Sequence, residues 1–166
     1  QPSLQAWLPD RPLVVLAHAL ALSGMTLYVH ALRQFHGLPF RALLLAPALL
    51  GSSAIAAVTL LDLGLAWRIV CTSLTFAVLL IAGLHTLSGA NPLAPRISSR
   101  VLRIAFLVLT VAVSLRAVQA GLHPPQGAVL IDLTRGPVLA QLLLMSALPV
   151  VGTSVFFAMC SERMRL

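Results

Sequence analysis

The sequence lacks the charge that a water-soluble protein needs. Only 9% of its 166 residues are charged and 59% are hydrophobic, whereas a soluble domain carries about 25% charged residues. This shortage excludes a globular protein that faces water on all sides. We therefore expect an integral membrane protein, whose outer surface faces lipid.

Lysine and acidic residues are the scarcest polar types. The chain has no lysine, and its four carboxylates are Asp10, Asp62, Asp132 and Glu162. With so few carboxylates, the chain has few side chains that could act in general acid–base catalysis or bind a metal ion. The sequence also has no HExxH motif, no P-loop and no pair of neighbouring carboxylates. We expect that this chain is not an enzyme and that it holds no metal ion.

Cysteine is nearly absent, with Cys71 and Cys160 as the two examples. Both lie inside apolar runs, and their spacing matches no metal-binding motif. The pattern predicts two small buried residues and excludes a disulfide framework.

Long apolar blocks of Leu, Ala and Val are what the sequence has in abundance. These blocks lack the period-two alternation of β-barrel strands, and a membrane-spanning helix needs roughly 20 apolar residues. Five stretches meet that length, so we expect a single all-α domain, a polytopic transmembrane bundle of five helices. The predicted spans are 12–32, 41–61, 67–87, 101–120 and 137–159.

The arginines indicate how these spans are oriented. There are eleven of them, and they give the chain a net charge of +7. Because they lie at the span ends, we expect these arginines to set the orientation of the spans and to contact lipid phosphates. This placement argues against nucleic-acid binding. Seven lie on the side of the C-terminus, three lie on the opposite side, and Arg116 lies within the fourth span. Because cytoplasmic loops carry the excess of arginine, we expect an outside N-terminus and a cytoplasmic C-terminus.

The two ends of the sequence favour a module of a longer protein. The first residues form no signal peptide, since no basic segment precedes an apolar one, so additional upstream helices or a cleaved leader would explain an outside N-terminus. Residues 161–166, SERMRL, contain no Gly or Pro that would stop a helix. We expect them to begin a cytoplasmic signalling helix, with an ordinary basic tail as the alternative.

Two segments and the final residues carry a resemblance to a known family. LYVHALRQFHGLPFR (27–41), LAWRIVCTSLTFAVLL (65–80) and SERMRL resemble the multi-span N-terminal sensor region of bacterial GGDEF proteins, the diguanylate cyclases that make cyclic-di-GMP. The resemblance implies a sensor in the bacterial inner membrane that controls a cytoplasmic cyclase outside this chain. It also implies a homodimer, because such cyclases act as dimers. The GGDEF signature itself is absent.

Arginines at membrane depth are the first candidate site. Arg116 lies near the outer end of the fourth span, and Arg68 opens the third span beside Trp67. Guanidinium groups recognise carboxylate and phosphate, so we expect these three residues to bind an anionic or amphipathic ligand such as a lipid. The alternative is that the arginines reach the membrane interface or pair with Asp62 or Asp132.

Histidines within the spans are the second candidate site. His18 lies in the outer part of the first span and could join the arginine site. His30 and His85 lie near the inner ends of the first and third spans, where they could serve as the two axial ligands of a b-type haem. Ordinary hydrogen bonding at the membrane interface is the alternative for both residues.

The sequence thus favours a transmembrane sensory module, and three other functions stay open. The first is a b-type-haem electron-transfer or redox-sensing subunit. The second is a small transporter, which the nearly apolar mid-membrane positions disfavour, because transport pathways are lined by polar side chains. The third is an accessory subunit of a membrane complex.

Overall fold

Four long helices make up most of the computed structural model. It describes residues 10–88, 96–122, 152–158, 160–162 and 164. The long helices are α1 (Asp10–Phe35), α2 (Leu45–Leu60), α3 (Leu65–Ser88) and α4 (Arg96–Leu122), and a 3-10 turn η2 (Ala42–Leu44) precedes α2. No strand occurs among the described residues, which agrees with the predicted all-α fold.

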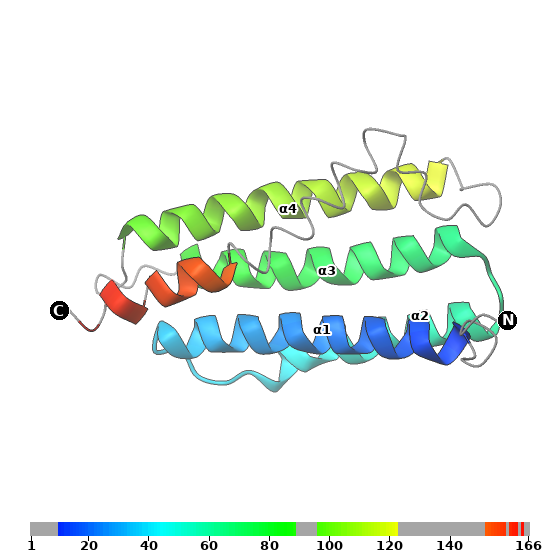
Figure 1. The fold of residues 1–166 in the computed structure, drawn as a ribbon, viewed down its shortest axis with the longest axis horizontal. Helices are drawn as coiled ribbons and strands as arrows, with labels where there is room; N and C mark the ends of the chain where they lie inside the picture. The colour runs from blue at the N-terminus through cyan, green and yellow to red at the C-terminus, as the bar shows by residue number, and fades with distance from the viewer. Residues whose placement is uncertain (1–9, 89–95, 123–151, 159, 163, 165–166) are drawn as a thin grey trace, which may run out of the picture.

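The helices lie side by side along the long axis of the molecule (Figure 1). Helix α3 is the central element, because it contacts α1, α2 and α4. We call the end where α1 and α3 begin the Asp62 end, after the turn that joins α2 to α3. The opposite end, where α1 and α3 finish and α4 begins, is the Arg33 end.

All four helices are long and apolar enough to cross a membrane. The qualifying segments are Arg11–Phe35, Ala42–Leu60, Leu65–Ser88 and Ser98–Leu122, with mean hydropathies between 1.7 and 2.1. Only 17–28% of the residues in each apolar window are buried in the bundle, so most of these side chains face outward. An outward-facing apolar surface of this extent is compatible with lipid and not with water. The fifth predicted span, 137–159, lies largely outside the described residues.

The tightest packing joins α3 to α4. Phe106 is 2% exposed and packs with Leu32, Leu80 and Leu87 in the larger hydrophobic cluster. A Cβ at Gly83 would collide with the Phe106 ring. In lipid, small residues of this kind let neighbouring helices approach closely, so Gly83 is what allows α4 to lie against α3.

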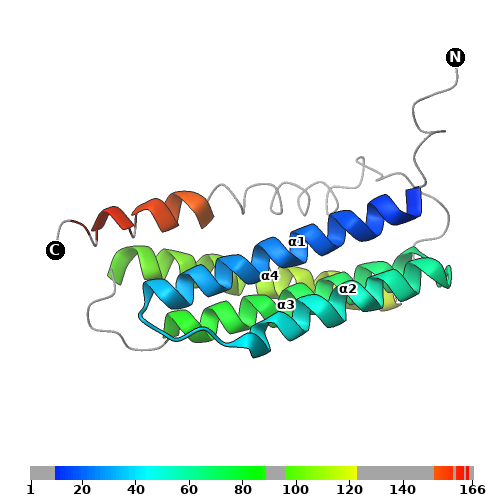
Figure 2. The same ribbon diagram turned by 90° about the horizontal axis from the view of Figure 1, so that it is seen from below.

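Helix α2 is shorter than its neighbours. It has 16 residues, against 26, 24 and 27 in α1, α3 and α4, which corresponds to about 24 Å against about 36–41 Å. At the Asp62 end, a tight turn with φ 53 at Asp62 and φ 89 at Gly64 leads directly into α3. The missing length of α2 is therefore at the Arg33 end, where a segment without α-helix leads from α1 to α2 (Figure 2).

The late start of α2 differs from the boundary that the sequence predicted for the second span. The second span was expected to begin at Arg41, because the apolar run begins there. Arg41 has an extended backbone (φ −122, ψ 107) and is followed by the 3-10 turn. Hydropathy does not separate such a turn from a helix, so the α-helix starts later than the apolar run.

Candidate functional site

At the Asp62 end, one carboxylate joins three elements. Asp62 accepts a hydrogen bond from Nη2 of Arg11 at 3.2 Å, and Nη2 of Arg68 lies 3.6 Å from its other oxygen. The Asp62 and Arg11 side chains are mostly exposed. Exposed pairs of this kind contribute about 0–1 kcal/mol, so they orient the start of α1 on the α2–α3 turn without contributing much stability.

Arg68 is the least exposed member of this group. Its side chain is 22% exposed, and its Nε is buried without a hydrogen-bond partner among the described residues. Neighbouring Trp67 is 58% exposed and faces outward. The alternative of pairing with Asp62 is thus observed for Arg68, while its buried Nε still lacks an acceptor. Pairing with Asp132 lies outside the described residues.

Arg116 lies on α4 at a deeper level than Arg68. The antiparallel register is fixed by Arg103, which donates to the Leu87 carbonyl, and by the contact of Phe106 with Gly83. Counting ten residues in each direction from that contact puts Arg116 level with Ser73. This level is five residues beyond Arg68, or about 7.5 Å further along the axis.

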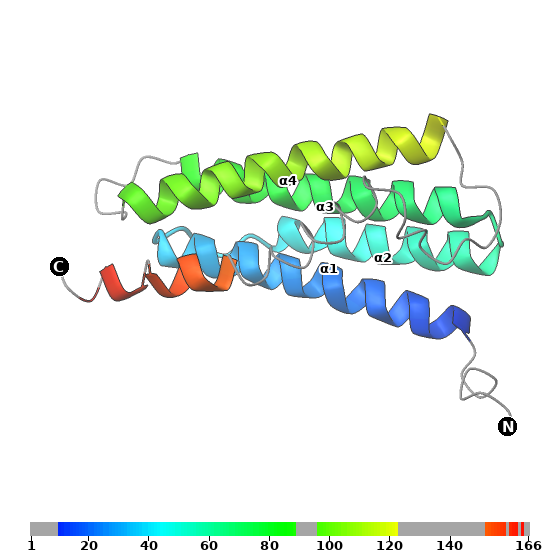
Figure 3. The same cartoon turned by 45° about the horizontal axis from the view of Figure 1, so that its top comes forward.

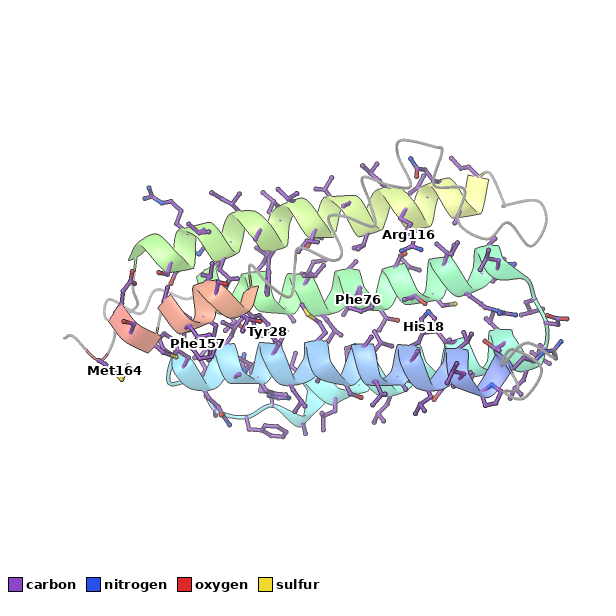
Figure 4. All side chains as sticks on the ribbon, viewed as in Figure 1. His18, Tyr28, Phe76, Arg116, Phe157 and Met164 are labelled. Atoms are coloured by element: carbon purple, nitrogen blue, oxygen red, sulfur yellow. The ribbon has the colours of Figure 1, made fainter. Side chains whose placement is uncertain are left out.

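Arg116 and His18 both face the interior at this level. Arg116 is half-buried, and Figure 4 shows it directed from α4 toward α3. His18 is half-buried on α1 and is also directed toward α3, and its Nδ1 lies 2.7 Å from the Val14 carbonyl. The structure therefore brings Arg68, Arg116 and His18 to one end of the bundle at staggered depths, and it places Trp67 outside them.

The two histidines of the haem hypothesis have different surroundings. His30 is 5% exposed, and its ring stacks on Phe40 at 4.2 Å between centroids. His85 is exposed on α3, on the same stripe as Leu74, Val78 and Ile81. No cluster of three or more potential metal ligands occurs in the described parts of the chain.

A second group of contacts joins the C-terminal residues to the Arg33 end. Residues 152–158 are helical and lie along this part of the bundle (Figure 3). The hydroxyl of Tyr28 donates to the Gly152 carbonyl at 3.0 Å. Phe156 packs against the rings of Tyr28 and Phe35, with centroid distances of 6.3 and 5.9 Å. Aromatic pairs at this separation add to the energy of burial.

The last described residues contact the start of α4. Ser98 Oγ donates to Glu162 Oε1 at 3.0 Å. A carboxylate beside the first turn of a helix also interacts favourably with the helix dipole. We call the described residues 152–158, 160–162 and 164 the exit segment, which is thus attached to α1 through Tyr28 and to α4 through Ser98.

The sequence analysis did not select Tyr28, Phe156 or Ser98. Tyr28 offered one signal, because it is the only tyrosine of the chain and a buried phenol needs a hydrogen-bond partner. Its partner lies 124 residues away, so no local pattern could identify it. No protein-family model, curated protein or solved structure matches this chain.

Proposed function

We propose that this chain is a transmembrane sensory module that binds a ligand near the Asp62 end and transmits the change through the exit segment at the Arg33 end. In this proposal the Arg33 end faces the cytoplasm, because most arginines lie on that side. The N-terminus is then outside, and the full set of spans is five, with the exit segment beginning within the cytoplasmic part of the fifth.

The observation that carries the proposal is the attachment of the exit segment to two different helices. Tyr28, on α1, donates a hydrogen bond to the Gly152 carbonyl, and Ser98, on α4, donates one to the Glu162 carboxylate. Both contacts lie at the opposite end of the bundle from Arg68 and Arg116. A ligand that changes how α1, α3 and α4 pack at the Asp62 end would therefore move the exit segment. Such a change is a population shift between two helix arrangements.

The ligand is an anionic amphiphile, such as a fatty acid or a lipid. Arg68 has a buried Nε without an acceptor, and Arg116 is half-buried without a carboxylate partner among the described residues. Two guanidinium groups at staggered depths suit a charged headgroup near the membrane interface. The apolar tail of the ligand would follow the outer face of the helices, and His18 and Trp67 would complete the site.

The output domain in this proposal is a cytoplasmic diguanylate cyclase, as the resemblance of the three sequence segments implies. Such an output requires a homodimer in the inner membrane of a bacterium. The continuous helical residues 160–162 support an exit segment that can carry a rotation or a displacement to the following domain. The chain itself acts as the sensor and not as the enzyme.

Ligand binding to the purified chain in lipid nanodiscs tests the input side of this proposal. Labelled oleate and decyl phosphate should bind, and Arg116→Ala should weaken binding by about tenfold, the usual effect of losing a charge-assisted hydrogen bond. Arg100→Ala, an exposed arginine at the other end of α4, is the matched control and should leave the affinity unchanged. Unchanged affinity for both probes in Arg116→Ala would refute the site.

A further inference from the structure

The Arg33 end contains a second pair of basic side chains, which are buried more deeply than those at the Asp62 end. His30 and Arg33 are 5% and 7% exposed. They lie three residues apart on α1, so their side chains are neighbours on one face of the helix. Because α2 is short at this end, the segment that leads from α1 to α2 covers them.

The cover is attached by two contacts. Arg33 Nη2 donates to the Pro39 carbonyl at 3.1 Å. The Phe40 ring stacks on the His30 ring with an angle of 14° between their planes. Phe40 is itself 58% exposed, so one of its faces is open to lipid. The cover is therefore thin, and no helix lies over it in the described part of the chain.

Beneath this cover, several hydrogen-bonding atoms lack a partner. The Nε of Arg33 and both ring nitrogens of His30 are buried and make no hydrogen bond within the described residues. The two carboxylates whose side chains the structure describes are engaged elsewhere. Asp62 pairs with Arg11 and Arg68 at the opposite end, and Glu162 accepts from Ser98. A buried cation without an anion is unfavourable, so the Arg33 guanidinium needs a negative partner.

We propose that Arg33 and His30 form a binding site for the phosphate of an anionic membrane lipid, with Pro39 and Phe40 as its displaceable cover. Arginine keeps its charge, and its planar group matches the geometry of phosphate. The histidine ring supplies a further donor. In the orientation proposed above, this end meets the cytoplasmic leaflet, which is rich in anionic lipids. The site is separate from the Arg68 and Arg116 site at the other end.

Lipid binding to single-residue variants tests the site. The purified chain in detergent is titrated with phosphatidylglycerol or phosphatidylcholine, and bound lipid is counted by native mass spectrometry. Arg33→Gln should weaken phosphatidylglycerol binding by about tenfold, as expected for loss of a charge-assisted hydrogen bond. His30→Phe keeps an aromatic ring against Phe40 and should weaken it by about threefold. Arg41→Gln, an exposed arginine at the same end, should have no effect.

Four outcomes would overturn the proposal. Equal affinity for phosphatidylglycerol and phosphatidylcholine would show that the negative charge of the lipid is not recognised. An equal loss of affinity in Arg41→Gln and Arg33→Gln would show that the lipid is attracted by the overall positive charge of this end and not by a site. Release of bound lipid by millimolar inorganic phosphate would assign the anion to a soluble source. If Arg33→Gln does not fold, Arg33→Lys provides the test. It keeps the charge but not the planar fork, so it should fold and still lose affinity, and wild-type affinity in this variant would contradict the proposal.

Discussion

The two ends of the bundle use charged and polar residues in opposite ways. At the Asp62 end, Arg11 and Asp62 form an ion pair that is mostly open to solvent or headgroups. At the Arg33 end, His30 and Arg33 are buried and Tyr28 holds a distant carbonyl. The ion pair at the Asp62 end is accessible from outside the bundle, whereas Arg33 Nε and the His30 ring nitrogens are buried without a hydrogen-bond partner among the described residues.

The two ends of the bundle therefore differ in how easily their polar contacts can be broken. Exposed ion pairs are weak and screened by salt, so in the proposed sensor the ion pair at the Asp62 end would be broken at little cost. Aromatic contacts and partly buried hydrogen bonds at the Arg33 end attach the exit segment to α1 and α4. In the proposed sensor, ligand binding and attachment of the exit segment would therefore use opposite ends of the same helices.

The largest effect is expected from removing the aromatic core beside the Arg33 end. Phe106→Ala should lower the free energy of unfolding by about 3 kcal/mol, because it leaves a cavity against Gly83 on α3. Leu107→Ala is the matched control, since the Leu107 side chain is 56% exposed, and it should cost less than about 0.5 kcal/mol. Unfolding by SDS in mixed micelles measures both values, and equal losses would contradict the assigned core.

A smaller effect is expected from cutting the contact between α1 and the exit segment. Tyr28→Phe removes the donor to Gly152 and should release residues 152–158, at a cost of about 1 kcal/mol. Hydrogen exchange of the amides in this segment should become faster. Thr72→Val, which removes a local bond to the Arg68 carbonyl at the other end, should leave their exchange unchanged. Unchanged exchange in Tyr28→Phe would mean that other contacts hold the exit segment.

The smallest effect is expected at the Asp62 end. A double-mutant cycle of Arg11→Gln and Asp62→Asn should give a coupling of about 0.5 kcal/mol at low salt and almost none at high salt, as for other exposed pairs. The readout is the free energy of unfolding of the two single variants and the double variant. A coupling above about 2 kcal/mol, typical of buried pairs, would remove the contrast between the two ends.

Hydropathy was sufficient to predict the long helices but not their contacts. The first predicted span, 12–32, lies within α1 (Asp10–Phe35), because a run of apolar residues in lipid has no stable alternative to a helix. The start of α2 differed, since apolar residues also form the 3-10 turn that precedes it. Arg68 and Arg116 lie toward the same end of the bundle, with Arg116 at the deeper level, and their role in binding a ligand stays a prediction.

The partners of individual side chains could not be predicted in the same way. Whether Arg68 meets Asp62 depends on the left-handed turn at Asp62, which charge patterns do not reveal. The burial of His30 depends on the short α2 and on Phe40 lying over the ring. Both features arise from tertiary packing, so they cannot be predicted from the periodicity of the sequence.

The central claim is that a ligand at the Asp62 end moves the exit segment. Spin labels at Leu20→Cys and Phe157→Cys, both exposed positions, report the distance between α1 and the exit segment once Cys71 and Cys160 are replaced by alanine. Oleate should shift this distance by about 1–2 Å, the scale of helix shifts in allosteric transitions, and Tyr28→Phe should abolish the shift. Saturating oleate that binds without changing the distance would contradict the claim.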